Sequence, residues 1–269
     1  MLLQHQPKMK DNTPLVSIIV PTNRRISYLN KCLESILEQT YTHYEVLIIS
    51  DGEDKKTEQL VSKYLTDKRV HFFEFRKTGL PAAIRNFGLT KAKGDYIAFC
   101  DDDDMWTNNK LAEQIKCCTD NNVDICFTLS NRINAEGFII KNTLYYKIRN
   151  ICDFLCHTCD FYLLFSNFVT LSSLIVRADS MHKFDESPEF RGSEDYDLMI
   201  KMLHQSRYYF IKEKLVFYRI HDDNLSGDTP SAYKRAIKIF EQSTVTKKYG
   251  YFVVALAKLH LQFRIWMYK

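Results

Sequence analysis

The sequence predicts an α/β fold in which a mainly parallel central sheet carries helices on both faces, followed by a C-terminal helical extension. In the first half, short apolar runs alternate with amphipathic segments, and polar residues follow several of the runs. Repeated strand–helix–strand units favour parallel strands joined by right-handed crossovers. From residue 232 onward the pattern is helical, with a break near Gly250.

The first half contains five runs typical of buried strands, because they are rich in β-branched or aromatic side chains. These runs span residues 15–20, 45–50, 70–75, 96–100 and 124–129. Apolar residues at helical spacing predict the intervening helices at 26–39, 55–64, 81–91 and 108–119. In the second half we expect strands at 138–146 and 171–176, a helix at 193–204, and a hairpin of 208–211 with 215–220.

The amino-acid composition argues against several classes of protein. The 269 residues are 45% hydrophobic, which predicts a substantial core, and the net charge of +4 does not favour a nucleic-acid-binding protein. Residues 1–14 form a polar tail without the apolar core of a signal peptide, and no apolar run approaches the ~18 residues of a membrane span. Because Cys100 and Cys126 lie in strand-like runs, we interpret the eight Cys as reduced thiols and expect a cytoplasmic protein.

Four successive aspartates, Asp101 to Asp104, follow the predicted strand at 96–100. So much negative charge needs a positive partner, and an all-oxygen site suits a hard cation such as Mg²⁺ or Mn²⁺. The alternative is a solvated turn that caps the next helix. Because the segments 21–23 and 50–52 also follow strand ends, we expect them to share one crevice with the aspartates.

A series of motifs in one order is more specific than any single motif. Ser17 to Arg24 resembles an opening strand, Cys32 to Tyr41 a first helix, and Glu45 to Gly52 a second strand with its nucleotide-contacting acid. Further motifs are Arg85-Asn86-Phe87-Gly88, Gly94 to Asp104 with its Asp-x-Asp motif, Ser193 to Leu198 with a Glu-Asp pair, and Tyr218-Arg219-Ile220-His221. Over residues 15 to 225 the chain resembles glycosyltransferase family 2, the inverting enzymes with the GT-A fold.

The resemblance implies which residues bind the donor. Asp51 would accept a hydrogen bond from the N–H of a uracil. Arg85 would either bind phosphate as a bidentate donor or form an ion pair with the aspartates. Asp102 and Asp104 have the alternative of only shaping the turn. The full set of donor-binding residues implied is Pro21, Thr22, Asn23, Asp51, Arg85, Asp101 and Asp102.

The resemblance also implies a metal site and a base. Asp103 would bind Mn²⁺ or Mg²⁺, and His221 would be a further metal or phosphate contact, with a surface histidine as its alternative. The acceptor hydroxyl needs a carboxylate base, for which Asp195 is the first choice and Glu194 the second. Both acids have the alternative of capping the helix that follows them.

The expected activity is transfer of a sugar from a UDP-sugar to a hydroxyl of a glycan or lipid-linked glycan, such as bacterial surface polysaccharide or lipopolysaccharide. Residues 15–228 would form the catalytic domain, with a donor half at 15–130, an acceptor half at 131–228, and a helical extension at 229–269. Two alternatives stay open: a binding module that has lost catalysis, and a metal-dependent nucleotidyltransferase. A nucleotidyltransferase needs a Gly-rich loop after the first strand, and a Rossmann oxidoreductase needs Gly-x-Gly-x-x-Gly; the sequence has neither.

Two further segments need an interpretation. Cys152, Cys156 and Cys159 have the spacing of a radical-SAM iron–sulfur motif, but we favour ordinary thiols over a cluster or a zinc site. The segment 249–269 is apolar and aromatic with interspersed Lys and Arg. One interpretation is a peripheral contact with an anionic membrane, and the slightly preferred one is packing on the catalytic domain or on a second subunit of a homodimer.

Overall fold

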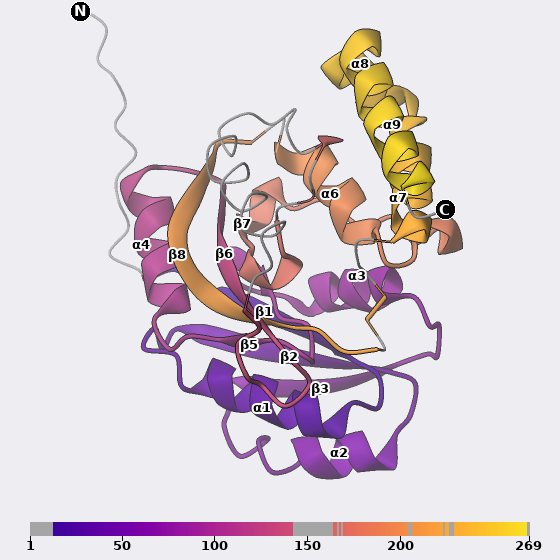
Figure 1. The fold of residues 1–269 in the computed structure, drawn as a ribbon. Helices are drawn as coiled ribbons and strands as arrows, with labels where there is room; N and C mark the ends of the chain where they lie inside the picture. Colours follow the sequence, from indigo (N-terminus) through magenta and orange to yellow (C-terminus); the bar gives the residue numbers. More distant parts are fainter. Residues whose placement is uncertain are drawn as a thin grey trace, which may run out of the picture.

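The computed structural model describes residues 13–141, 164–165, 167, 169–203, 206–222, 224–225 and 229–267. Within these ranges, eight strands form one sheet in the order β3-β2-β1-β4-β7-β6-β8-β5. Helices lie on both faces of the sheet (Figure 1). The predicted α/β fold, with a central sheet between helices, is therefore confirmed.

The first half follows the predicted alternation and builds the parallel part of the sheet. β1 pairs in parallel with β2 and with β4, and β2 pairs in parallel with β3. The short strand β5 was not predicted. The elements of this half are β1 (Val16–Thr22), α1 (Ile26–Leu37), β2 (Tyr44–Asp51), α2 (Lys55–Val61), β3 (Val70–Phe75), α3 (Pro81–Lys91), β4 (Tyr96–Phe99), β5 (Met105–Trp106), α4 (Lys110–Asp120) and β6 (Ile125–Ile133).

Side chains of the parallel strands alternate between two hydrophobic cores. In β1, Ile19 belongs to the core that also contains apolar residues of α3, whereas Ile18 and Val20 belong to the core with α1, α2 and α4. Because both faces are covered by helices, β1, β2 and β4 are mostly apolar runs in the sequence. This explains why the strands of the first half could be recognised without an alternating pattern.

Antiparallel strands join the second half to the sheet. β7 (Ile175–Arg177) pairs antiparallel with both β4 and β6. The sheet is thus parallel at four of its seven strand pairings. The predicted strand at 171–176 is wrong in its first half, because Leu171–Ser173 form a 3₁₀ turn, η2, stabilised by the Ser173 N–H bond to the carbonyl of Thr170. Two more 3₁₀ turns follow, η3 (Ala178–Ser180) and η4 (Pro188–Phe190).

The predicted hairpin is wrong, because Tyr208–Arg219 form one continuous strand, β8. β8 pairs in parallel with β6, and the register shifts on either side of Leu129. The exposed, charged residues Lys212, Glu213 and Lys214 lie at this irregularity, so they resemble a turn in the sequence. A β-bulge accommodates extra residues in one strand without ending the strand.

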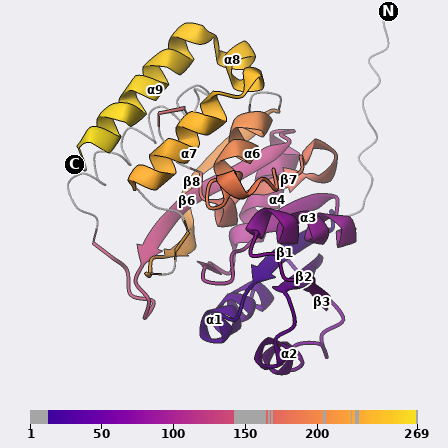
Figure 2. The same cartoon turned by 90° about the vertical axis from the view of Figure 1, so that its right-hand side faces the viewer.

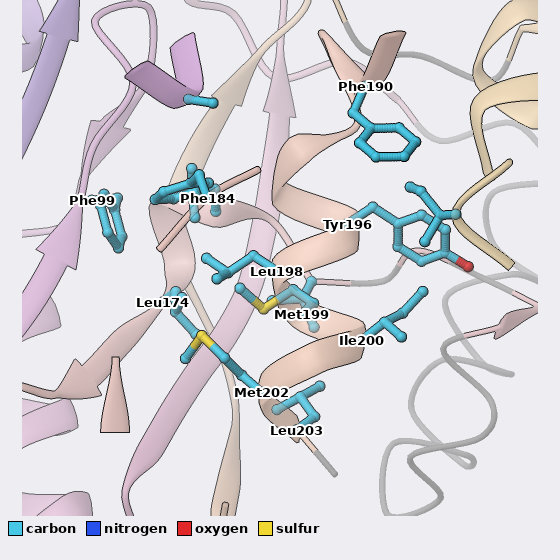
Figure 3. Close-up of a cluster of buried hydrophobic side chains, with 14 of the residues drawn as sticks. Phe99, Leu174, Phe184, Phe190, Tyr196, Leu198, Met199, Ile200, Met202 and Leu203 are labelled. Atoms are coloured by element: carbon cyan, nitrogen blue, oxygen red, sulfur yellow. The ribbon is translucent and has the colours of Figure 1, made fainter. Parts of the chain in front are cut away.

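The helix α6 (Glu194–Leu203) anchors the second acidic motif in a hydrophobic core. Leu198, Met199 and Met202 are at most 1% exposed and point from this helix toward Phe99 and Phe184 (Figure 3). Burying a side chain of this size stabilises the fold by roughly 1.5–3 kcal/mol. The first turn of α6 is therefore held in a fixed position relative to β4.

Three helices form the predicted C-terminal extension: α7 (Pro230–Phe240), α8 (Ser243–Tyr249) and α9 (Tyr251–Trp266). The break at Gly250 is confirmed, and this glycine has a φ of 80°. α9 packs along α7 at one edge of the molecule (Figure 2). Among the helices that the structure describes, none is both long and apolar enough to cross a membrane.

Several predicted features fall on segments at the margin of the described ranges. Ile139 forms an isolated bridge with Ile133, while residues 142–146 of the predicted strand at 138–146 lie outside the described residues. The segment from Cys152 to Cys159 also lies outside them. The cysteines that are described are buried free thiols, namely Cys32, Cys100, Cys117, Cys118 and Cys126.

Candidate active site

The carboxyl ends of three strands meet at one edge of the sheet, because β2, β1 and β4 are parallel neighbours. Thr22 ends β1, Asp51 ends β2, and the run Asp101 to Asp104 follows β4. Pro21 lies inside β1, one residue before its end, opposite Ile49. The predicted convergence of these segments is confirmed.

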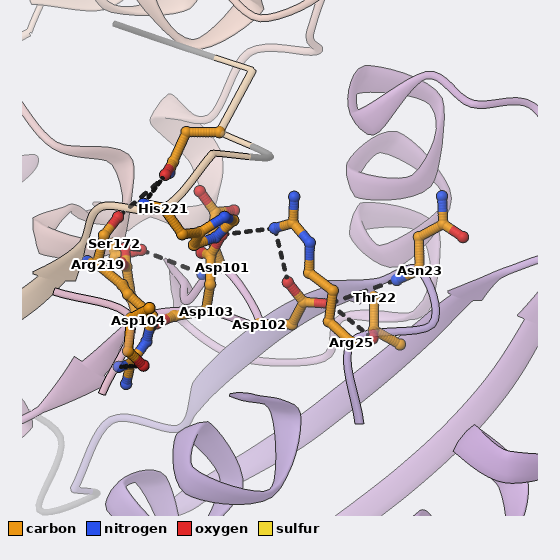
Figure 4. Close-up of polar contacts among 12 residues, drawn as sticks. Thr22, Asn23, Arg25, Asp101, Asp102, Asp103, Asp104, Ser172, Arg219 and His221 are labelled. Carbon is orange, nitrogen blue, oxygen red and sulfur yellow. Dashed lines mark hydrogen bonds and ion pairs between the residues drawn. The ribbon is translucent and has the colours of Figure 1, made fainter. Parts of the chain in front are cut away.

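Asp102 holds the loop that follows β1. Its Oδ2 accepts hydrogen bonds from Oγ1 of Thr22 at 2.8 Å and from the backbone N–H of Asn23 at 3.4 Å (Figure 4). The side chain of Asp102 is buried. Asp102 therefore positions two of the residues that were predicted to line the nucleotide pocket.

Arg25 forms ion pairs with two of the aspartates. Its Nη1 lies 3.3 Å from Oδ1 of Asp102 and 2.5 Å from Oδ2 of Asp103 (Figure 4). Burial lowers the pKa of Arg25, but attraction to the two aspartates outweighs burial, so the pKa is raised. Arg25 was not among the predicted site residues. The available signal was the basic pair Arg24-Arg25 directly after a strand end whose neighbour carries four acids.

Asp103 and His221, the predicted metal ligands, meet at one carboxylate oxygen. Nε2 of His221 lies 3.0 Å from Oδ2 of Asp103, and the side chains are 6% and 8% exposed. The imidazole stacks on the ring of Tyr28 with 5.2 Å between the centroids. A carboxylate oxygen and an imidazole nitrogen this close together can ligate one divalent cation.

Asp104 has a structural role, because neighbouring protein groups bond to both of its carboxylate oxygens. It is fully buried, its Oδ2 accepts a hydrogen bond from Ser172 at 2.6 Å, and its Oδ1 accepts one from the N–H of Arg219 at 2.9 Å. Nε of Arg219 donates in turn to the carbonyl of Asp103 at 2.7 Å. Ser172 of η2 and Arg219 of β8 therefore hold the acidic turn in place. Neither was among the predicted site residues.

Arg85 joins the acidic run to the second acidic motif. Its Nη2 lies 2.7 Å from Oδ1 of Asp101, and its Nη1 lies 2.7 Å from Oε1 of Glu194. Of the two roles left open for Arg85, the structure shows the ion pair. The contact brings Asp101, which is the most exposed member of the run, beside the start of α6.

Glu194 accepts three hydrogen bonds. Besides the contact with Arg85, its Oε2 accepts from the N–H groups of Gly192 at 2.6 Å and Ser193 at 3.1 Å. Gly192 has a φ of 80°, and an added Cβ would lie 2.7 Å from the carbonyl oxygen of Leu225, so the turn requires glycine. This geometry fits the capping role that was the alternative for Glu194.

Asp195 has a different environment from its neighbour. It is partly exposed, and its Oδ1 accepts one hydrogen bond from the N–H of Tyr196 at 2.7 Å. Burial, followed by repulsion from Glu194, raises the pKa of Asp195 to about 6. A carboxylate that titrates near neutrality is suited to accept a proton. Asp195 therefore differs from Glu194, whose oxygens accept three hydrogen bonds.

Asp51 orders a neighbouring loop. Its Oδ1 accepts from the N–H of Thr78 at 2.6 Å and from its hydroxyl at 3.1 Å, and its Oδ2 accepts from the N–H of Gly79 at 2.9 Å. A carboxylate offers about four acceptor positions. One position is therefore left for the predicted contact with a pyrimidine N–H.

Burial raises the pKa values of the acidic run. Desolvation, followed by repulsion from Asp103, raises the pKa of Asp102 to about 7, and burial also raises the pKa values of Asp103 and Asp104. In the described part of the chain, no three His, Cys, Asp or Glu side chains form a complete metal cage. The donors present fit Mn²⁺ or Mg²⁺, which commonly take few protein ligands and complete their shell with water and phosphate.

The chain is similar to several known proteins. The model of Glycosyl transferase family 2 matches residues 17–177. An uncharacterized glycosyltransferase of Rickettsia bellii (strain RML369-C) is 30% identical over 223 residues, covering 82% of this chain and 31% of the relative. The putative teichuronic acid biosynthesis glycosyltransferase TuaG of Bacillus subtilis (strain 168) is 30% identical over 125 residues, covering 46% of this chain and 50% of TuaG.

Solved structures share the fold at low sequence identity. Staphylococcus aureus TarS 1-349 in complex with UDP-GlcNAc has a TM-score of 0.69 and 16% identity, covering 94% of this chain and 73% of that chain. The mannosyltransferase PcManGT from Pyrobaculum calidifontis, in complex with GDP-Man and Mn²⁺, has a TM-score of 0.67 and 14% identity, covering 94% of this chain and 74% of that chain.

The fold is thus that of the GT-A glycosyltransferases. The chain belongs to glycosyltransferase family 2. The family match ends at residue 177, so Glu194, Asp195 and His221 lie beyond it. The chain spans less than a third of the length of each of three Rickettsia relatives.

Proposed function

We propose that this chain transfers a sugar from a UDP-sugar to a hydroxyl of a glycan acceptor, in a reaction that requires Mn²⁺ or Mg²⁺. The observation that carries the proposal is the pair of ion contacts made by Arg85. They connect Asp101 of the acidic run to Glu194, the neighbour of Asp195, and so support a site that the acidic run and Asp195 share. The nucleotide sugars in the TarS and PcManGT structures support a donor of this class.

The residues divide into donor, metal and acceptor roles. In this proposal residues 15–130 hold the donor and 131–228 hold the acceptor. Asp103 and His221 would hold the metal, which when bound offsets the negative charge that develops on the UDP leaving group. The nucleotide and sugar would contact Pro21, Thr22, Asn23, Asp51, Asp101 and Asp102.

Asp195 would act on the acceptor. As the acceptor oxygen forms its bond to the anomeric carbon, its proton passes to the Asp195 carboxylate. The bond between the anomeric carbon and the phosphate oxygen breaks, and UDP leaves with the electron pair. A single displacement of this kind inverts the configuration at the anomeric carbon. Glu194, held by Arg85 and two backbone N–H groups, would keep Asp195 in place.

The acceptor class follows from the relatives with printed roles. TuaG, a putative teichuronic acid biosynthesis glycosyltransferase, supports a bacterial surface polysaccharide or a related glycan. We place the reaction in the cytoplasm, which the buried free thiols support.

A panel of nucleotide sugars tests the proposal, with UDP release measured in Mn²⁺, in Mg²⁺ and in EDTA. We expect slow hydrolysis of one UDP-sugar that depends on the metal and that falls when Asp103 or Asp195 is changed. Binding of a UDP-sugar without turnover, in the presence of a range of glycan acceptors, would instead support the module that has lost catalysis. Release of pyrophosphate from a nucleoside triphosphate would support the nucleotidyltransferase.

A further inference from the structure

The outward face of α9 is apolar along its length except at the exposed Gln262. The opposite face, formed by Val254, Ala257 and Leu261, is buried in the core that includes residues of α6 and α7. Residues three or four positions apart lie on one side of a helix. The side chains that follow this spacing on the outward face are 42–76% exposed, and they are Phe252, Leu256, Leu259, Phe263 and Trp266.

A surface helix ordinarily places polar or charged residues on such a face. α9 instead contains no Asp or Glu. Its two Lys and Arg residues are held against the rest of the extension: Lys258 lies 3.6 Å from Glu241, and Arg264 donates to the hydroxyl of Tyr233 at 2.6 Å. The outward face is thus an apolar surface, interrupted by Gln262, with basic residues beside it.

Positive charge is concentrated in this part of the chain. From residue 229 to 269, the sequence contains eight Lys and Arg but one acidic residue, Glu241. The extension therefore has a net charge of +7, whereas the whole chain has +4 and the preceding residues are net negative. A second copy of this chain would bring two surfaces of like charge together, which opposes association. An anionic surface is complementary to both the charge and the apolar face.

We propose that α9 lies on an anionic membrane surface with its outward face inserted at the level of the headgroups. Its 16 residues are about 24 Å long, and helices with one inserted apolar face lie in the plane of the interface. Tyr251 and Trp266, at the two ends of α9, are 86% and 65% exposed and belong to the residue types that favour this interface. α9 lies at the outer edge of the molecule, beyond α7, where a flat surface can reach it (Figure 2).

This contact goes beyond sugar transfer, and vesicle binding tests it without any donor or turnover. The protein is floated with vesicles of neutral phosphatidylcholine or with vesicles that also contain about 30% phosphatidylglycerol. We expect binding to the anionic vesicles that weakens as salt screens the charge. The double variant Leu259→Gln/Phe263→Gln should lower the partition coefficient by about tenfold or more, since it removes two large apolar side chains from the lipid.

The matched control is Leu65→Gln/Phe138→Gln, which changes a Leu and a Phe that are 46% and 73% exposed elsewhere on the molecule. This control should bind vesicles as the unchanged protein does. Both double variants should have the melting temperature of the unchanged protein. The fluorescence of Trp266 provides a second measurement. Trp106 is 4% exposed, so a blue shift on adding anionic vesicles should come from Trp266 and disappear in Trp266→Phe.

Two results would overturn the proposal. The first is equal or no binding to neutral and anionic vesicles, with unchanged Trp266 emission. The second is a doubled mass in analytical ultracentrifugation that Leu259→Gln/Phe263→Gln abolishes, because a second copy would then cover the face. Either result would leave the proposed transferase activity untouched, since that activity is measured by UDP release in the absence of lipid.

Discussion

Arg85 and Glu194 form a buried ion pair, with 2.7 Å between Nη1 and Oε1, although 109 positions separate them in the chain. The same guanidinium reaches Asp101. Burial lowers the pKa of Arg85, but attraction to Asp101 and Glu194 outweighs burial, so the pKa is raised and the guanidinium stays charged. The positive charge of Arg85 thus compensates the negative charges of Asp101, which follows β4, and of Glu194, which begins α6. The position of the proposed base therefore depends on a residue of α3 that does not touch it by hydrogen bond.

Replacing Arg85 by Met should strongly destabilise the protein. The change leaves the buried Glu194 carboxylate without its cation, and breaking a buried pair from one side costs about 3–5 kcal/mol. The free energy of unfolding in urea measures the effect. The control is Arg69→Met, which removes a surface pair with Asp67 whose partners are 33% and 30% exposed, and which should cost less than about 1 kcal/mol. Equal losses in the two variants would contradict a structural role for Arg85.

Asp195→Asn should lower turnover roughly 100-fold or more while UDP-sugar binding stays near normal, because an amide cannot accept the proton. The pKa of Asp195 is raised to about 6, so the carboxylate is ionised above that pH and protonated below it. We therefore expect kcat/KM to rise through about pH 6 to a plateau, and this step to vanish in the variant. Asp179→Asn, at an exposed aspartate, is the control that should keep the full pH profile. Normal turnover of Asp195→Asn would move the base elsewhere.

Asp103→Asn should abolish the part of UDP affinity that depends on Mn²⁺. The substitution removes the carboxylate that lies 3.0 Å from His221, and hence the proposed bridge between the protein and the diphosphate. Calorimetric titration of UDP, with Mn²⁺ and with EDTA, measures the difference. Asp120→Asn, at an exposed residue at the end of α4, should show the same Mn²⁺ dependence as the unchanged protein. If Asp103→Asn also shows it, Asp103 is not the ligand.

Arg25→Met should lower the free energy of unfolding by about 1–3 kcal/mol in EDTA, because Asp102 and Asp103 lose a cation. Mn²⁺ should reduce this loss of stability, since a bound metal ion would offset the negative charge of the same two carboxylates. Arg24→Met is a matched control, because Arg24 is the exposed neighbour. An equal effect of both substitutions would show that Arg25 acts through the loop rather than through its ion pairs.

Local sequence patterns predicted the first half well, because β1, β2 and β4 are buried on both faces and the helices follow an amphipathic period. They failed where pairing between distant segments decides the structure. β8 continues through Lys212 to Lys214 because β6 pairs with it on both sides of that irregularity. β5 has two residues, too few for any pattern, and forms because β8 lies beside it.

The same reason separates the site residues that were predicted from those that were missed. Asp51 ends a strand, and Asp103 and His221 follow strand ends, which is a local feature. Ser172 and Arg219 act by hydrogen bonds to Asp104 from 68 and 115 positions away, and no local pattern reports such a contact. From its charge alone, Arg85 could either bind phosphate or form an ion pair with the aspartates. The sequence could not decide between these roles, because the distances between the residues depend on the fold.

The exposed segment Lys212 to Lys214 has a consequence for how related chains can vary in length. A strand directs successive side chains to opposite faces, so the loss of one residue there would invert the facing of every later position in β8. Arg219 would then turn away from the carbonyl of Asp103, and His221 from its carboxylate. Replacing one of the three exposed side chains would leave the facing of the strand unchanged, whereas an insertion or deletion of one residue would turn this end of β8 away from the proposed metal-binding residues.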